Sequence, residues 1–251
     1  MKLDHQKRSN GDYYFVNNKK PFKGIVINEV DLKNVLDFAY EMCFGNGHHR
    51  STRTGGQYGR KNGEKFCNTF QGKLAEVVLY NYFKSKSVVC NKPDFGIYGE
   101  GIWDDTDLEI LNKKINVKSA ASQSNLLLLE TKDWTNNGQY IPNLNNSSAN
   151  LYDYFILIRV NPDIKKLFRS KKLMYNDVIP KIDIENIIFK QTWSYDIAGY
   201  CTTKNLIQAI ADNNILPQNS ILNEYTKMDA ENYYIQCGDM KDIDELIKSL
   251  Q

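Results

Sequence analysis

The residues from Asp107 to Lys118 have the types and the spacing that metal-assisted hydrolysis of a phosphodiester requires. Two short runs of alternating polar and apolar residues surround a polar turn in this stretch, which predicts a β-hairpin. Since alternate residues of a strand point to opposite faces, one face of this hairpin is apolar. The other face carries two acids, an amide and a lysine, namely Asp107, Glu109, Asn116 and Lys118.

The register of the hairpin decides which of these polar side chains lie together. The two- or four-residue connection that we predict sets Glu109 opposite Asn116 and Asp107 opposite Lys118. Directly opposed Cβ atoms lie roughly 4.5–5.5 Å apart, which is close enough to share a cation or a water. A three-residue turn would shift the pairing by one residue and put Glu109 out of reach.

A predicted helix upstream of the hairpin supplies a further acid. Residues 72–83 have the apolar face of a largely buried helix, and Glu76 interrupts that face near its start. A buried carboxylate needs a partner, and a metal ion is a suitable one. Glu76 is therefore a candidate metal ligand, with an ordinary paired helix acid as the alternative.

This order of residues resembles the PD-(D/E)xK nuclease superfamily, which includes most type II restriction endonucleases. The resemblance implies an α/β fold with a mixed central β-sheet flanked by helices, in a restriction-endonuclease-like αβββαβ core. Asp107 matches the first aspartate of the family, with Asp105 as its rival, and Lys118 matches the lysine. Glu76 matches the helix glutamate that many members place next to the metal.

One position departs from the family pattern. Asn116 stands where the family has Asp or Glu, and a neutral amide oxygen is a weaker ligand for a hard cation than a carboxylate. Three interpretations follow. The site tolerates Asn as a variant, or Glu109 or Glu130 supplies the missing acid, or the protein binds DNA without cutting it.

The function that the resemblance implies is a Mg²⁺-dependent, sequence-specific endonuclease for double-stranded DNA, of the type II restriction class. Asp107 and Glu76, with Asp105 and Glu109 as further candidates, would hold Mg²⁺, and Lys118 would orient the attacking water. Cleavage of both strands needs two sites, so a homodimer is expected on a palindromic sequence. The alternatives are a repair or junction-resolving nuclease and a catalytically silent DNA-binding protein of the same fold.

A basic loop precedes the predicted catalytic part of the chain. The stretch from Gly45 to Gly63 is rich in glycine and arginine, and such a loop can contact phosphates or base edges. An ordinary solvated loop is the alternative. Its candidate DNA-binding residues are His48, His49, Arg50, Arg53, Arg60 and Lys61.

The length and composition permit one large domain or two small ones. The chain has 251 residues, 41% of them hydrophobic, and a net charge of +2, so overall charge does not indicate a nucleic-acid binder. We predict a single domain over 1–251, with an N-terminal helical and basic-loop region to about residue 70 and a catalytic core over about 71–251. Five scattered cysteines without a Cys-x-x-Cys pair, and the lack of a signal peptide or an apolar run of roughly 20 residues, predict a cytoplasmic protein without a membrane span.

Hydrophobic periodicity predicts the elements that position these residues. The predicted helices cover 29–44, 72–83, 163–175, 203–211 and 241–250. Beyond the hairpin, the predicted strands cover 88–90, 126–129, 154–160, 195–200 and 233–236. The polar stretch 135–150 is predicted to be a long loop.

Overall fold

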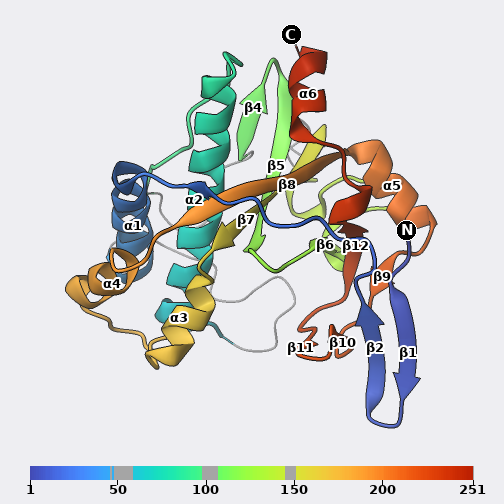
Figure 1. The fold of residues 1–251 in the computed structure, drawn as a ribbon, viewed down its shortest axis with the longest axis horizontal. Coiled ribbons are helices and arrows are strands. Elements are labelled where there is room, and N and C mark those ends of the chain that lie inside the picture. Colours follow the sequence, from blue (N-terminus) through green and yellow to red (C-terminus); the bar gives the residue numbers. More distant parts are fainter. Residues whose placement is uncertain (46, 48–58, 98–106, 145–150, 251) are drawn as a thin grey trace.

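The computed structural model describes residues 1–45, 47, 59–97, 107–144 and 151–250, and its architecture is mixed α/β (Figure 1). The helices are α1 (Glu29–Phe44), α2 (Asn62–Ser85), α3 (Ile164–Ser170), α4 (Lys181–Ile188), α5 (Thr203–Ala211) and α6 (Ile243–Leu250). The strands are β1 (Asp4–Arg8), β2 (Gly11–Phe15), β3 (Ile25–Val26), β4 (Leu108–Ile110), β5 (Lys113–Ala121), β6 (Leu126–Glu130), β7 (Tyr154–Asn161), β8 (Ser194–Thr202), β9 (Ile215–Leu216), β10 (Ile221–Leu222), β11 (Thr226–Lys227) and β12 (Asn232–Gln236). Three 3₁₀ turns are η1 (Thr131–Asp133), η2 (Ile141–Asn143) and η3 (Cys237–Asp239).

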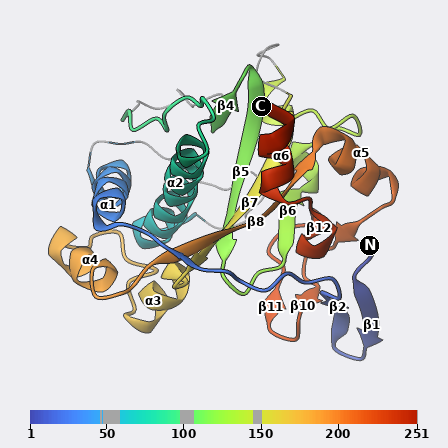
Figure 2. The same cartoon turned by 45° about the horizontal axis from the view of Figure 1, so that its top comes forward.

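A five-stranded mixed sheet with the order β3-β8-β7-β5-β4 forms the centre of the molecule. β7 runs parallel to β5 and antiparallel to β8. Helices α1 and α2 lie together on one side of this sheet, as both views show (Figures 1 and 2). The prediction of an α/β fold with a mixed central sheet is therefore confirmed.

The two faces of the central sheet contribute to two different hydrophobic cores. Ile115, Ile156 and Ile158 point to the first core, which they share with α1, α2 and α3. Phe155 and Leu157 point to the second core, which they share with β6, η3 and α5. This division follows from the two-residue period of the strands, and it decides which helices or strands a given side chain of the sheet can meet.

The hairpin forms as predicted, but its register differs. Glu109 pairs with Lys114 rather than with Asn116. The connection is the two-residue turn Leu111-Asn112, in which φ is 48° and 62°. Positive φ at both central residues is typical of the type I′ turn, whose twist matches that of an antiparallel hairpin. The predicted register was wrong because leucine at such a position does not signal a tight turn.

α2 is longer than predicted, because it begins at Asn62 and continues through the glycine at which we expected it to start. Phe66 and Phe70 extend its buried face toward the N-terminus. Gly63 is tightly packed, since a Cβ atom there would lie 2.2 Å from the carbonyl oxygen of Leu173. α2 thus crosses residue 70, where the predicted N-terminal region meets the core.

Among the described helices, none combines the length and the apolarity that crossing a membrane requires.

The other predictions vary in accuracy. α1, α5, α6, β6, β7, β8 and β12 agree with prediction to within two residues at each end. α3 ends at Ser170 rather than at 175, and the predicted strand 88–90 is reduced to one bridge between Cys90 and Ile110. The hairpin β1–β2, which forms a four-stranded sheet with β10 and β11, was not predicted.

A buried ion pair ties the N-terminal segment to the central sheet. Arg159 of β7 is 1% exposed and donates two hydrogen bonds to the carboxylate of Asp196, at 2.9 and 2.5 Å. Its Nη1 donates to the carbonyl oxygen of Lys20, and Nη2, which also bonds Asp196, donates to that of Pro21, both at 2.9 Å. The guanidinium thereby fixes the chain before β3 against the sheet, from a strand whose other residues between 154 and 160 are all apolar or aromatic.

Candidate active site

The hairpin brings Asp107, Asn116 and Lys118 to one face of the sheet. Continuing the observed register by one pair sets Asp107 opposite Asn116. Asn116 and Lys118 lie beside Phe155 and Leu157 of β7, so they share the face of the second core. Three residues that were predicted together from the alternation therefore remain on one face.

The carboxylate of Asp107 is fixed against the neighbouring strand. Its Oδ2 accepts a hydrogen bond from the backbone N–H of Val117 at 2.7 Å. This bond orients the side chain of Asp107 toward β5.

Asn116 carries a buried acceptor without a donor. The residue is 5% exposed, and its Oδ1 has no hydrogen-bond partner among the described residues. Such an orphaned polar atom costs about 1–3 kcal/mol. An oxygen in that state is suited to a hard cation, so the donor set of Asp107 and Asn116 fits Mg²⁺ in chemistry, with one charge fewer than two carboxylates would give.

Lys118 lines a cleft of about 380 Å³ between β5, β6 and β12. Three acids line the same cleft, namely Glu130, Asp133 and Asp229. Glu130 is one of the two residues predicted to supply the missing acid, and its side chain is 13% exposed, with Oε2 at 3.4 Å from Nζ of Lys132. Asp133 and Asp229 were missed, because their approach depends on the pairing of β6 with β12, which no local pattern indicates.

Glu109 and Glu76 have other neighbours. Glu109 lies opposite Lys114, at the far end of the hairpin from Lys118. Glu76 forms an ion pair of 2.5 Å with Lys73, both side chains being nearly buried. The ammonium group of Lys73 lies over the ring of Phe38, at 5.2 Å from its centroid.

Helix α2 packs on the opposite face of the sheet from Lys118. Gln71 of this helix donates a hydrogen bond of 3.3 Å to the hydroxyl of Ser119, which alternates with Lys118 along β5. The structure therefore brings Lys118 together with Glu130 in one cleft, and it sets the α2 layer that carries Glu76 on the first-core side.

The candidate DNA-binding residues are only partly described. Asp105, His48, His49, Arg50 and Arg53 lie outside the described residues. Arg60 and Lys61 directly precede α2, and Nζ of Lys61 lies 2.6 Å from Oδ2 of Asp177. That ion pair is half exposed, so solvent screens it and a phosphate could replace Asp177.

Within the described ranges, no group of three or more His, Cys, Asp or Glu side chains is arranged to hold a metal ion. A cation at the hairpin would therefore depend on Asp107 together with the amide oxygen of Asn116. No protein-family model matches the chain, and neither curated proteins nor solved structures give a significant match.

Proposed function

We propose that this protein is a Mg²⁺-dependent endonuclease that cuts double-stranded DNA, of the PD-(D/E)xK type and closest in kind to type II restriction enzymes. The observation that carries this proposal is the hairpin face on which Asp107, Asn116 and Lys118 lie together, with no donor to the Asn116 oxygen in the part of the chain that the structure describes. Neutral amide oxygens that are buried without a partner are rare in proteins. A bound cation would account for this one.

The chemistry assigns a role to each side chain. Asp107 and Asn116 would hold Mg²⁺, which polarises the scissile phosphate when it is bound. Lys118 would orient the attacking water and offset the negative charge that develops on the phosphate. Glu130, in the same cleft as Lys118, is the stronger of the two candidates for the relocated acid, because Glu109 lies opposite Lys114.

The order of the elements supports this fold assignment in part. α2, the bridge at Cys90, β4 and β5 follow one another as the first four elements of an αβββαβ core do. β7 returns parallel to β5, as a strand does after a crossover connection. The crossover departs from the family pattern, since its described residues form β6, η1 and η2 rather than an α-helix.

A homodimer on a palindromic site remains the expected assembly, because cutting both strands takes two active sites. The second candidate function is a catalytically silent DNA-binding protein. Asn116 favours it, since the site has one carboxylate fewer than the family pattern. A repair or junction-resolving nuclease of the same fold is the third.

The deciding experiment incubates the purified protein with unmodified plasmid DNA, in Mg²⁺ or in EDTA. Discrete fragments that disappear in EDTA and with Lys118→Ala would support the proposal. Lys113→Ala is the matched control, because it removes one lysine from the same hairpin at an exposed ion pair with Asp153. Binding without cleavage in any divalent ion would favour the silent protein, and randomly nicked products would argue against sequence-specific restriction.

A further inference from the structure

The end of α3 and the turn after it form a strongly basic surface. From Ile164 to Tyr175 the sequence has five cations and no acid. Four of these cations are exposed, and none of them forms an ion pair with another described residue. We call these four the α3 basic surface: Lys166, Arg169, Lys171 and Lys172.

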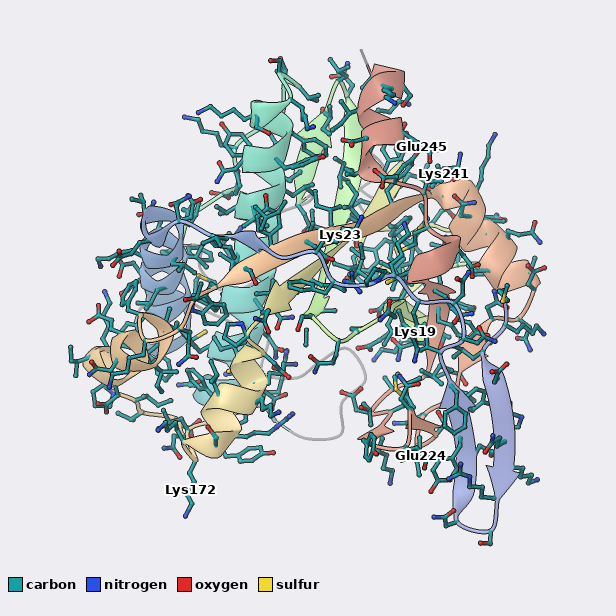
Figure 3. All side chains as sticks on the ribbon, viewed as in Figure 1. Lys19, Lys23, Lys172, Glu224, Lys241 and Glu245 are labelled. Carbon is teal, nitrogen blue, oxygen red and sulfur yellow. The ribbon has the colours of Figure 1, made fainter. Side chains whose placement is uncertain are left out.

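Lys172 occupies a position that normally belongs to glycine. The N–H of Lys172 donates to the carbonyl of Arg169 at 3.0 Å, and that of Leu173 donates to the carbonyl of Phe168 at 2.9 Å. This is the Schellman pattern of helix termination, whose left-handed residue is here Lys172, with φ 57°. A side chain is strained in this conformation. The chain thus keeps a lysine at a position where glycine would relieve the backbone strain. Figure 3 shows the Lys172 side chain pointing away from the molecule.

The apolar side of α3 faces inward. Ile164 and Phe168 are buried in the first core, where the ring of Phe168 stacks on that of Phe66 with 5.4 Å between centroids. A helix that inserts into a lipid surface needs an outward apolar face, which α3 does not have. Cations on a rigid element suit the phosphates of a nucleic acid instead.

The α3 basic surface adjoins the start of α2. The carbonyl of Asn176, just after the basic surface, accepts a hydrogen bond of 2.9 Å from the N–H of Gly63. Asp177 pairs with Lys61, which directly precedes α2. The two predicted DNA-binding residues that the structure describes, Arg60 and Lys61, are therefore close neighbours of this surface.

We propose that the α3 basic surface binds the phosphate backbone of double-stranded DNA. The choice of partner rests on the proposed function, and the inference deepens it by assigning backbone binding to residues outside the cleft of Lys118. Backbone contacts of this kind set the affinity and the position of the duplex, and they carry no sequence information.

The test compares two variants that each lose four positive charges. One removes the α3 basic surface (K166Q/R169Q/K171Q/K172Q), and the matched control removes exposed lysines elsewhere (K7Q/K204Q/K227Q/K248Q). Binding of a fluorescent duplex is measured by anisotropy in Ca²⁺ or EDTA, over a series of salt concentrations. We expect the first variant to bind at least about tenfold more weakly, and the slope of log K against log salt to fall by about 3–4. Equal weakening of both variants would overturn the inference.

The Lys172→Gly variant distinguishes an effect on DNA affinity from an effect on the stability of the fold. We expect its Tm to be unchanged or higher by up to about 2–4 °C, because strain is relieved, while the salt slope falls by about one. Unchanged affinity and slope would contradict a role for Lys172. Binding to anionic vesicles that depends on the α3 basic surface, without binding to DNA, would also overturn the proposal.

Failure of this inference and failure of the proposed function give different results. If the quadruple α3 variant cleaves plasmid DNA and its DNA affinity is unchanged, DNA binding by the α3 basic surface is refuted and the proposed nuclease activity is not. If DNA binding depends on the α3 basic surface but no divalent ion supports cleavage, the proposed nuclease activity is refuted and the role of the surface is not.

Discussion

The backbone N–H of Val117 donates a hydrogen bond of 2.7 Å to the carboxylate of Asp107. This bond joins the residue before β4 to the middle of β5, next to the orphaned oxygen of Asn116. Asp107 therefore has two separable roles, one in closing the hairpin and, in the proposed function, one as the carboxylate beside Asn116.

Asp107→Asn should separate these roles. An amide oxygen can still accept from Val117, so we expect Tm to stay within about 2 °C of the wild type, while plasmid cleavage falls at least about a hundredfold. Asp107→Ala removes both roles and should lower Tm as well. Cleavage at the wild-type rate by the Asn variant would exclude Asp107 from the active site.

Substitutions of Asn116 should reveal a bound cation through thermal stability. Asn116→Asp places a buried charge beside Asp107, so we expect a lower Tm in EDTA and a larger increase on adding Mg²⁺ than the wild type shows. In the wild type the orphaned oxygen costs about 1–3 kcal/mol of stability, and Asn116→Leu removes it. This variant should also abolish any Mg²⁺-dependent shift in Tm. Identical shifts in all three proteins would place the cation elsewhere.

A substitution in the turn of the hairpin should increase thermal stability without changing the candidate active site. Leu111 is 58% exposed and has φ 48°, a conformation that strains leucine more than it strains asparagine. We expect Leu111→Asn to raise Tm by about 2–4 °C and to leave plasmid cleavage unchanged. A lower Tm would show that the leucine side chain stabilises the fold through packing.

Breaking the buried ion pair should release the N-terminal segment. Arg159→Met leaves the charge of Asp196 buried without its partner. We therefore expect the free energy of unfolding, measured in urea titrations, to fall by about 3–5 kcal/mol. Trypsin should then cut at Lys20 or Lys23 in the folded protein. The double variant R159M/D196L, which removes both charges, should recover part of the loss, and failure to recover would assign the effect to packing.

Burial should keep two thiols protonated. It raises the pKa of Cys43 to about 12 and that of Cys237 to about 11. Both thiols should therefore react slowly with a disulfide reagent at pH 8 until the protein is unfolded. Because the unfolded thiols ionise first, stability should fall as the pH rises above about 9 toward these values, which urea titrations at several pH values would measure.

Much of the fold was predictable because it depends on local patterns. The apolar run of β7 identifies a buried strand, and Thr202 caps α5 through a capping box with Asn205. The predicted hairpin register differs from the observed one by two residues. A slip by an even number keeps every side chain on its face, so the grouping of Asp107, Asn116 and Lys118 survives the error.

The rest of the site depends on contacts between distant parts of the chain. Glu130 and Asp229 line one cleft because β6 pairs with β12, which follows it by about a hundred residues. Arg159 was missed for a related reason. Its burial depends on the ion pair with Asp196, 37 residues later, which no local pattern indicates.

The ties of the N-terminal segment also set an order of events during synthesis. Lys20 is bound by Arg159, 139 residues later, and Asn17 by the side chain of Gln236, 219 residues later. At about 5–20 residues per second, the ribosome supplies these partners on the order of ten seconds or more after the segment has emerged. Asn17 and Lys20 therefore stay without these partners until more than a hundred further residues have been made.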